Sequence, residues 1–303
     1  MLYYITYSAL YLVSLLPLRV LYFFSDVFCP FVRLFYRRDV VRTNLREAFP
    51  ELSDVELSRI ERRFYSQLCD YVVETVKLFS ISREELMRRM SFSGLDAINM
   101  GFDDLGKDTF FSYLGHYGNW EWIASLQYWM PNAKCCQIYH PLYNRTFNRI
   151  FLKLRQQYGG ECIPMKSTLR QLLRLRSEGR HIVCGFISDQ QPKWNAIHHF
   201  TPFLNHDTAV YIGTEQLGKR MDAMVFYAHV TRPKRGCYNC EFQLLTYTPR
   251  ECGDYELTDR FMQLLEQDIK ADPSLWLWTH KRWSRTREEW ERRNNAKTNS
   301  ESL

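Results

Sequence analysis

Short apolar segments alternate with helical segments from residue 109 onward, and this alternation limits the fold more than any other feature. The apolar segments cover residues 109–115, 134–139, 181–187, 223–230 and 240–248. We expect helices from about residue 119, over 144–158, over 167–178, over about 208–219 and over 256–270. Strands that are apolar along their length are buried on both faces. The sequence therefore predicts an α/β fold, whose central, mostly parallel or mixed sheet is flanked by helices.

A basic and helical accessory region is predicted over residues 26–92, before the first strand. Its longest helix lies in "SDVELSRIERRFYSQLCDYVVETVKLF", where Ser53 and Glu56 have the spacing of a capping box. Apolar residues then recur at three- and four-residue spacing, which is the period of an amphipathic helix. We interpret this region as accessory to the sheet domain.

The first 18 residues, "MLYYITYSALYLVSLLPL", carry no charged side chain. As a helix they would be roughly 27 Å long, close to the hydrocarbon thickness of about 30 Å. We therefore predict a membrane anchor helix over residues 1–25, which either spans the bilayer or lies in its interface, because Pro17 and Arg19 interrupt the apolar run. No basic segment precedes it and no small-residue cleavage site follows it, so we expect it to stay attached. A buried core helix is the alternative.

Basic residues follow the predicted anchor, although the formal charge of the whole chain is only +6. Near an anionic leaflet each contributes about 1 kcal/mol of attraction, and their position predicts that this side of the membrane is cytoplasmic. Nucleic-acid binding is not predicted, because the basic runs flank the anchor and the tail instead of lining an aromatic platform. The tail over 286–303 is charged and then polar, so we expect its last ten or so residues to be disordered. The basic residues near the anchor are Arg33, Arg37, Arg38, Arg42 and Arg46.

Metal and nucleotide chemistry find little support in the sequence. The nine cysteines are an odd number, which favours a reduced compartment over a disulfide framework. The pair Cys237 and Cys240 has no second pair to complete a zinc site, and we interpret it as the tip of a hairpin. Three histidines at 198, 199 and 206 are interpreted as loop residues, and no glycine-rich phosphate loop is present. We predict neither a metal nor a cofactor.

The stretch "FFSYLGHYGNWEWIA" places His116 and Glu121 where a strand is expected to turn into a helix. If the strand ends near Leu114, His116 lies in the loop and Glu121 in the first helical turn, where the helix dipole favours its charge. A carboxylate could then orient the imidazole as a general base. Open α/β sheets place their sites at such strand ends. A structural hydrogen bond or a surface pair is the alternative reading.

Several blocks, in order along the chain, resemble the bacterial lipid A late acyltransferases, which are relatives of the glycerolphosphate acyltransferases that carry HxxxxD. "GHYGNWEWIA" is similar to the HxxxxE block of that family, and four further blocks agree with it. Two departures are His140, where arginine is frequent, and Lys281, which replaces an arginine. The further blocks are "YHPLYNRTFNRIFLKLRQQYG", "GFISDQQP", "FTPFLNHDTAVYIGTEQLGKR" and "DPSLWLWTHKRW".

The resemblance implies roles for five residues. His116 is expected to take the proton of an acceptor hydroxyl, and Glu121 to hold and charge its imidazole. Arg155 matches the arginine of the family and is expected to stabilise an oxyanion or hold a phosphate. Asp189 and Gln190 are expected to support the site from a second strand end, with Asp189 orienting Arg155.

The resemblance also implies a glycerolphosphate-acyltransferase-like domain over residues 93–285 and an O-acyltransferase activity. The fatty acyl chain would pass from acyl carrier protein or coenzyme A to a hydroxyl or hydroxyacyl group of a lipid A precursor. The enzyme would sit at the bacterial inner membrane with its site facing the cytoplasm. Two alternatives stay open: an acyltransferase for another lysolipid, glycolipid or aminolipid, and a non-catalytic membrane protein that binds lipid. Acyl chain length and the acylated position are left open.

Overall fold

A seven-stranded sheet forms the centre of the protein, for which a computed structural model describes residues 2–301. The strand order is β1-β9-β8-β2-β5-β3-β4, and every pairing is parallel except that of β8 with β9. The predicted α/β class with a mostly parallel sheet is therefore confirmed. The strands are β1 (Met90–Ser93), β2 (Thr109–Leu114), β3 (Ala133–Tyr139), β4 (Glu161–Pro164), β5 (His181–Ile187), β8 (Met224–Lys234) and β9 (Cys237–Thr246).

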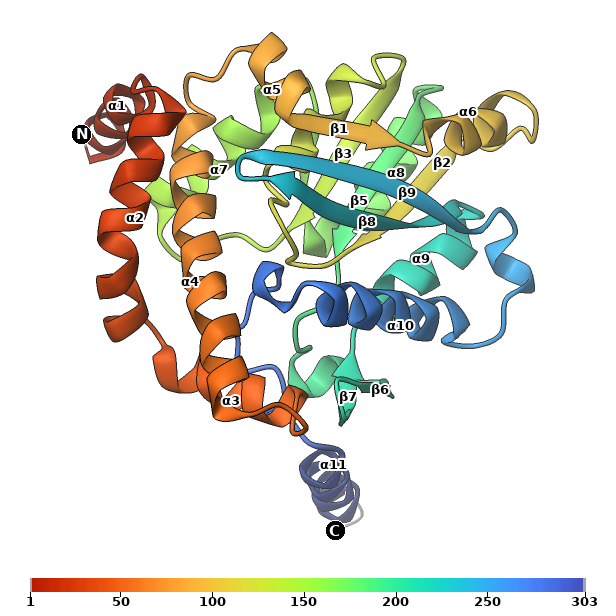
Figure 1. The fold of residues 1–303 in the computed structure, drawn as a ribbon. Helices are drawn as coiled ribbons and strands as arrows, with labels where there is room; N and C mark the ends of the chain where they lie inside the picture. Colours follow the sequence, from red (N-terminus) through yellow and green to blue (C-terminus); the bar gives the residue numbers. More distant parts are fainter. Residues whose placement is uncertain (1, 302–303) are drawn as a thin grey trace.

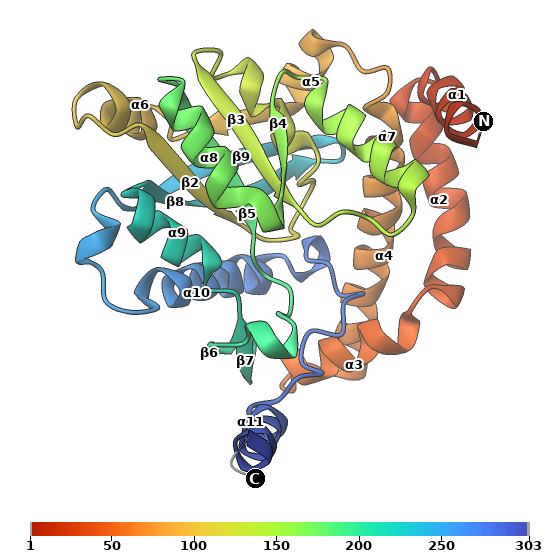
Figure 2. The same cartoon turned by 180° about the vertical axis from the view of Figure 1, so that it is seen from behind.

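Helices cover both faces of this sheet, as Figures 1 and 2 show from opposite sides. On one face, Leu172 and Leu175 of α8 pack with Phe111 and Cys184 of the central strands β2 and β5. On the same face, the ring of Phe261 in α10 stacks on Tyr113 of β2 at a centroid distance of 4.6 Å, because residues two apart in a strand point to one face. On the opposite face, Trp129 packs edge-on against Phe92 of β1 at a centroid distance of 6.1 Å. The helices of this body are α5 (Arg83–Arg89), α6 (Leu95–Asp103), α7 (Arg145–Gln156), α8 (Thr168–Ser177), α9 (Gly213–Met221) and α10 (Glu256–Ala271).

Three details of the sheet region differ from the sequence prediction. The helix expected over about 208–219 begins only at Gly213, because residues 206–210 form strand β7 (His206–Val210), which pairs with β6 (His199–Phe203). The left-handed backbone at Leu204 and Asn205, with φ of 47° and 66°, makes the tight turn that joins them. The helix expected from about 119 is the short 3₁₀ helix η1 (Trp122–Tyr128). The edge strands β1 and β4 were not predicted, because each has four residues, too few for a periodic signal.

The predicted anchor helix over residues 1–25 is instead two helices, α1 (Leu2–Ser14) and α2 (Leu18–Phe35), bent by 108°. Pro17 is the N-cap residue of α2, and its extended backbone, with ψ at 144°, separates the two helices. Proline also disfavours helical backbone in the residue before it. Lys77 donates hydrogen bonds to the carbonyls of Ser14 and Leu16 at 2.9 and 3.1 Å, which satisfies the backbone at the break. No single helix among residues 2–301 is long and apolar enough to cross a membrane, and only this bent pair passes by length and composition.

The accessory region contains α3 (Arg38–Ala48) and α4 (Asp54–Lys77), and α4 lies between α2 and the sheet (Figure 1). The predicted capping box is confirmed: Ser53 Oγ accepts from the backbone N–H of Glu56, whose carboxylate accepts from the backbone N–H of Ser53. Three of the basic residues that follow the predicted anchor form ion pairs within the protein: their guanidinium groups converge on the buried carboxylate of Glu61 in α4. They are Arg33, Arg38 and Arg42, each at 2.9 Å.

The C-terminal tail, expected to end in disorder, forms helix α11 (Arg287–Glu301), while residues 302 and 303 lie outside the described residues. Trp290 packs edge-on against Phe200 of β6 at a centroid distance of 5.7 Å, and Arg293 lies over the ring of Trp194. These contacts hold the first turns of a helix whose own sequence is almost wholly polar.

Candidate active site

A cavity of about 450 Å³ opens at the carboxyl ends of β2, β3 and β5, where open α/β folds place their sites. Its walls are mostly apolar, and four predicted site residues line it: His116, Glu121, Arg155 and Gln190. The apolar wall residues include Phe110, Ile123, Leu126, Ile138, Val183 and Phe242. The cavity thus combines a few converging polar groups with a surface suited to a hydrocarbon chain.

His116 is held by Asp189. Its Nδ1 lies 2.6 Å from Asp189 Oδ1, and its backbone N–H donates to Asp189 Oδ2 at 2.8 Å. The sheet register explains this pairing: Leu114 of β2 faces Ile187 of β5, so His116 and Asp189 each lie two residues past the last paired position. Two parallel strands therefore deliver the imidazole and the carboxylate to the same place.

The electrostatics of the pair favour an ionised Asp189, whose side chain is only 1% exposed. Burial acts to raise its pKa, but the charge of His116 and the hydrogen bonds from His116 and Trp276 outweigh burial, so the pKa lies below its ordinary value. A carboxylate at Nδ1 assigns the imidazole proton to that nitrogen. Nε2 then keeps its lone pair on the cavity side, 3.4 Å from Gln190 Nε2.

Glu121 is paired with Arg155. Arg155 Nε donates to Oε2 at 2.8 Å and Nη2 to Oε1 at 2.5 Å, so the guanidinium binds both carboxylate oxygens. The Glu121 side chain is 3% exposed. Burial acts to lower the pKa of Arg155, but Glu121 outweighs it and raises that pKa above its ordinary value. The guanidinium is therefore permanently charged, with further N–H groups available to the cavity.

The structure corrects the predicted partners of these residues. No hydrogen bond joins His116 to Glu121 in the described part of the chain: Asp189 holds the imidazole, and Glu121 holds Arg155. The two expected partnerships are exchanged, because β2 and β5 are neighbours in the sheet whereas Glu121 starts a 3₁₀ helix that faces α7. Gln190 lies beside the imidazole, as a supporting position requires.

Two residues that sequence reasoning missed shape the loop after His116. Asn119 Oδ1 accepts from the backbone N–H of Trp122 at 3.2 Å, and the Asn119 amide donates to the buried carboxylate of Glu74 in α4 at 2.7 Å. Gly118 has φ of 65°, and a Cβ there would lie 2.8 Å from Val230 Cγ1. Only the glycine and asparagine of "GHYGNWE" carried a signal, as residues that favour turns and caps.

The other candidate residues lie elsewhere. His199 binds Asp259 at 2.7 Å, and His206 stacks on Trp283. Cys237 lies in the β8–β9 hairpin, paired with Lys234, as predicted, and all nine cysteines are free thiols. Among residues 2–301 no group of three His, Cys, Asp or Glu side chains is placed to hold a metal ion.

This fold and site define a class: an α/β protein with an imidazole held by a buried carboxylate at the opening of a deep apolar cavity. Comparison with protein families then identifies the chain more closely. Residues 1–285 match the family model of the bacterial lipid A biosynthesis acyltransferases, and the chain belongs to this family. It is therefore an acyltransferase of lipid A biosynthesis. A search of curated proteins gave no match.

Proposed function

We propose that this protein moves a fatty acyl chain from the thioester of acyl carrier protein or coenzyme A to a hydroxyl or hydroxyacyl group of a lipid A precursor. The observation that carries the proposal is the His116–Asp189 pair at an apolar cavity. A thioester needs no metal to react with an activated alcohol, so the proposed reaction uses side chains alone. Asp189 takes the orienting role that sequence reasoning gave to Glu121.

In the first step, His116 Nε2 accepts the proton of the acceptor hydroxyl while the oxygen attacks the thioester carbon. The imidazolium that forms is stabilised by Asp189, which already binds Nδ1 at 2.6 Å. Asp189 also binds the backbone N–H of the same residue, so the ring is fixed at two points. The base is thus oriented before substrate arrives.

In the second step, the tetrahedral intermediate collapses and the C–S bond breaks. The thiolate takes the proton from the His116 imidazolium, which restores the neutral base. The negative charge on the intermediate needs donors, and Arg155 and Gln190 are the candidates because both line the cavity. Glu121 fixes the direction of the guanidinium by binding it through two nitrogens.

The cavity would hold the acyl chain beside the reacting thioester. Burial of each CH₂ group contributes roughly 0.8 kcal/mol, so a groove of this character selects for a long chain. Leu114 and Ile187 lie at the strand ends next to the polar groups, whereas Phe110 lies four residues earlier in β2, where its ring contacts Phe242. The polar groups therefore meet the thioester, and the aromatic wall meets the chain.

A membrane position on the cytoplasmic side of the bacterial inner membrane is part of the proposal. The outer faces of α1 and α2 carry large apolar side chains that nothing in the described chain covers, and a helix with such a face binds in a bilayer interface. We propose that the bent pair lies in the membrane and brings the cavity to its lipid acceptor. The most exposed residues include Leu2, Tyr4, Leu12, Phe23, Phe31 and Phe35.

The test compares two histidines that line the same cavity. His116→Ala should lower acyl transfer to a lipid A precursor at least 10³-fold, because the general base is lost. His140→Ala is the matched control: His140 is exposed, and its Nδ1 faces the carbonyl of Pro141 instead of a carboxylate. Products are measured by mass spectrometry with purified protein. Near-normal transfer by His116→Ala would reject the mechanism.

A further inference from the structure

The segment after α10 pairs with the loop that carries His116. Leu277 donates its backbone N–H to the His116 carbonyl at 3.1 Å, and Gly118 donates to the Leu275 carbonyl at 3.0 Å. Tyr117 and Trp276 form an antiparallel bridge between these two contacts. Backbone pairing on both sides of Trp276 fixes where its side chain can point.

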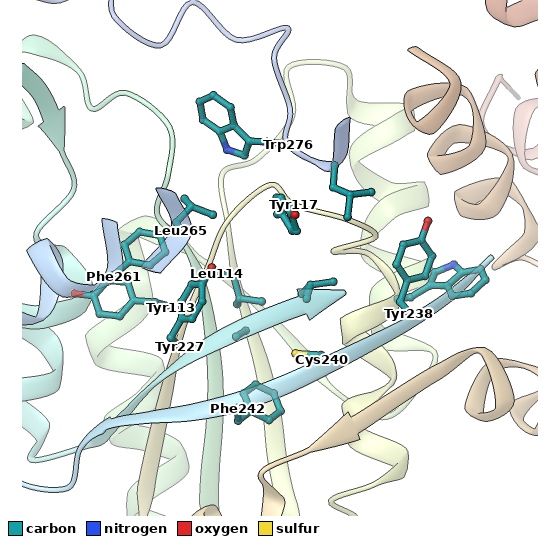
Figure 3. Close-up of a cluster of buried hydrophobic side chains, with 14 of the residues drawn as sticks. Tyr113, Leu114, Tyr117, Tyr227, Tyr238, Cys240, Phe242, Phe261, Leu265 and Trp276 are labelled. Carbon is teal, nitrogen blue, oxygen red and sulfur yellow. The ribbon is translucent and has the colours of Figure 1, made fainter. Parts of the chain in front are cut away.

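The side chain of Trp276 points to the carboxylate behind His116. Its Nε1 donates to Asp189 Oδ2 at 2.8 Å, in a contact with both residues buried. Asp189 Oδ2 thus accepts from the indole and from the His116 backbone, while Oδ1 is left for the imidazole. The indole ring packs perpendicular to Trp278 at a centroid distance of 4.6 Å, which holds its direction. Figure 3 shows Trp276 as part of the buried apolar cluster, on the segment that lies beside the loop carrying Tyr117.

We propose that Trp276 is a positioning residue of the acyl transfer, which acts through Asp189 to set the orientation and the basicity of His116. This inference rests on the proposed function, because it assumes that His116 is the base. The indole N–H removes negative charge from the carboxylate and holds it in the plane that meets Nδ1. Trp276 is not among the residues that line the cavity, so we expect it to act through Asp189 on the base.

The direction of the pH effect follows from this contact. Without the indole donor, Asp189 is a stronger acceptor for the Nδ1 proton, and the imidazolium becomes more stable. The imidazolium of the variant then gives up its proton only at a higher pH. The acid limb of the kcat/KM profile therefore moves to higher pH. We also expect a lower kcat, because the Asp189 carboxylate is held by one hydrogen-bond donor fewer and orients the imidazole less firmly.

Other charged groups near this pair are unchanged by the substitution. His280 and Arg282 lie close enough to interact with Asp189, and Arg155 with Glu121 faces the imidazole across the cavity. Burial lowers the pKa of His280 to about 4, so it stays neutral in the working range. Burial lowers the pKa of Arg282 to about 10, so it stays charged. These groups affect wild type and variant equally.

The experiment compares two Trp→Phe substitutions. Trp276→Phe should lower kcat about tenfold with little change in KM and should move the acid limb of kcat/KM to higher pH. Trp283→Phe is the control: it packs beside Trp276 at 6.3 Å, but its indole donates to Thr208. It should leave the acid limb in place. A Trp276→Phe enzyme whose acid limb matches that of the control overturns the inference, whatever its rate.

A second measurement keeps the test open if Trp276→Phe does not fold. In protein labelled with ¹⁵N-tryptophan, one indole N–H signal should have the downfield position of a hydrogen bond to a carboxylate, and it should lose that position in Asp189→Asn. The absence of such a signal from the wild-type spectrum overturns the inference. Inactive His116→Ala together with an unshifted Trp276→Phe would reject the role of Trp276 and leave the proposed function standing, whereas active His116→Ala rejects both.

Discussion

Two carboxylates beside one cavity do different work because their partners come from different parts of the fold. Asp189 meets His116 at the ends of two paired parallel strands, whereas Glu121 meets Arg155 between a 3₁₀ helix and α7. Asp189 binds one ring nitrogen and leaves the other free. Glu121 uses both oxygens on a guanidinium that cannot lose its proton. In the proposed reaction, the sheet therefore orients the group that takes the proton, and the helices hold a group that stays charged.

The largest effect is expected from breaking the first pair. Asp189→Asn should lower kcat about 10³- to 10⁴-fold, because an amide at Nδ1 favours the wrong tautomer and no longer stabilises the imidazolium. The control is Asp259→Asn, which removes a carboxylate from His199 at 2.7 Å, outside the cavity. Steady-state turnover with an acyl thioester measures both. Equal losses in the two variants would show that a His–Asp contact matters here only for folding.

The sequence named residues that line the candidate cavity, but it did not give their pairing. A histidine after a buried strand and an aspartate after another mark two strand ends, and both lie at the site. Their contact depends on β2 and β5 being neighbours, although β3 and β4 lie between them in the chain. Strand order is set by packing of the whole sheet, and local spacing does not contain it. Glu121 was assigned to His116 from its place five residues further on and from the resemblance to the HxxxxE block, and neither contains the strand order.

In the N-terminal segment, the sequence showed where the helix breaks but not how the two helices are oriented. Pro17 and Arg19 were visible as interruptions of the apolar run, and the break between α1 and α2 falls at Pro17. At the bend of 108°, Lys77 of α4 donates to the carbonyls of Ser14 and Leu16, a contact from far along the chain. A composition window measures how apolar a segment is, but it carries no information on a tertiary contact of this kind.

A smaller loss of activity is expected from breaking the second pair, Glu121 with Arg155. Glu121→Gln should lower kcat/KM about 10- to 100-fold, because Arg155 loses its anionic partner and its fixed direction. The acid limb of the pH profile should stay where it is in the wild type, since the His116–Asp189 contact is intact. A pH titration of kcat/KM for the two carboxylate variants separates these roles. A shifted acid limb in Glu121→Gln would mean that this carboxylate also acts on the base.

The smallest effect on the reaction is expected at a third buried carboxylate, Glu74, which faces neutral donors instead of a cation. Tyr22, Asn119 and Tyr238 donate to it at 2.7 to 2.9 Å, and burial raises its pKa to about 7, despite these bonds. Because this value lies above the ordinary 4.5, the native state binds the proton more tightly than the unfolded chain between these two pH values.

The contribution of Glu74 to stability is thus fully present below about pH 4.5 and is lost as the pH rises through 7. The loss is of the order of 3 kcal/mol by linkage. Glu74→Gln cannot titrate, so the stability gap between wild type and this variant should be larger at pH 5 than at pH 8, with kcat changed only a few-fold. Denaturant unfolding in detergent at both pH values measures the gap. A gap independent of pH would show that Glu74 stays ionised, as Asp189 does, and that neutral donors can replace a cation at a buried carboxylate.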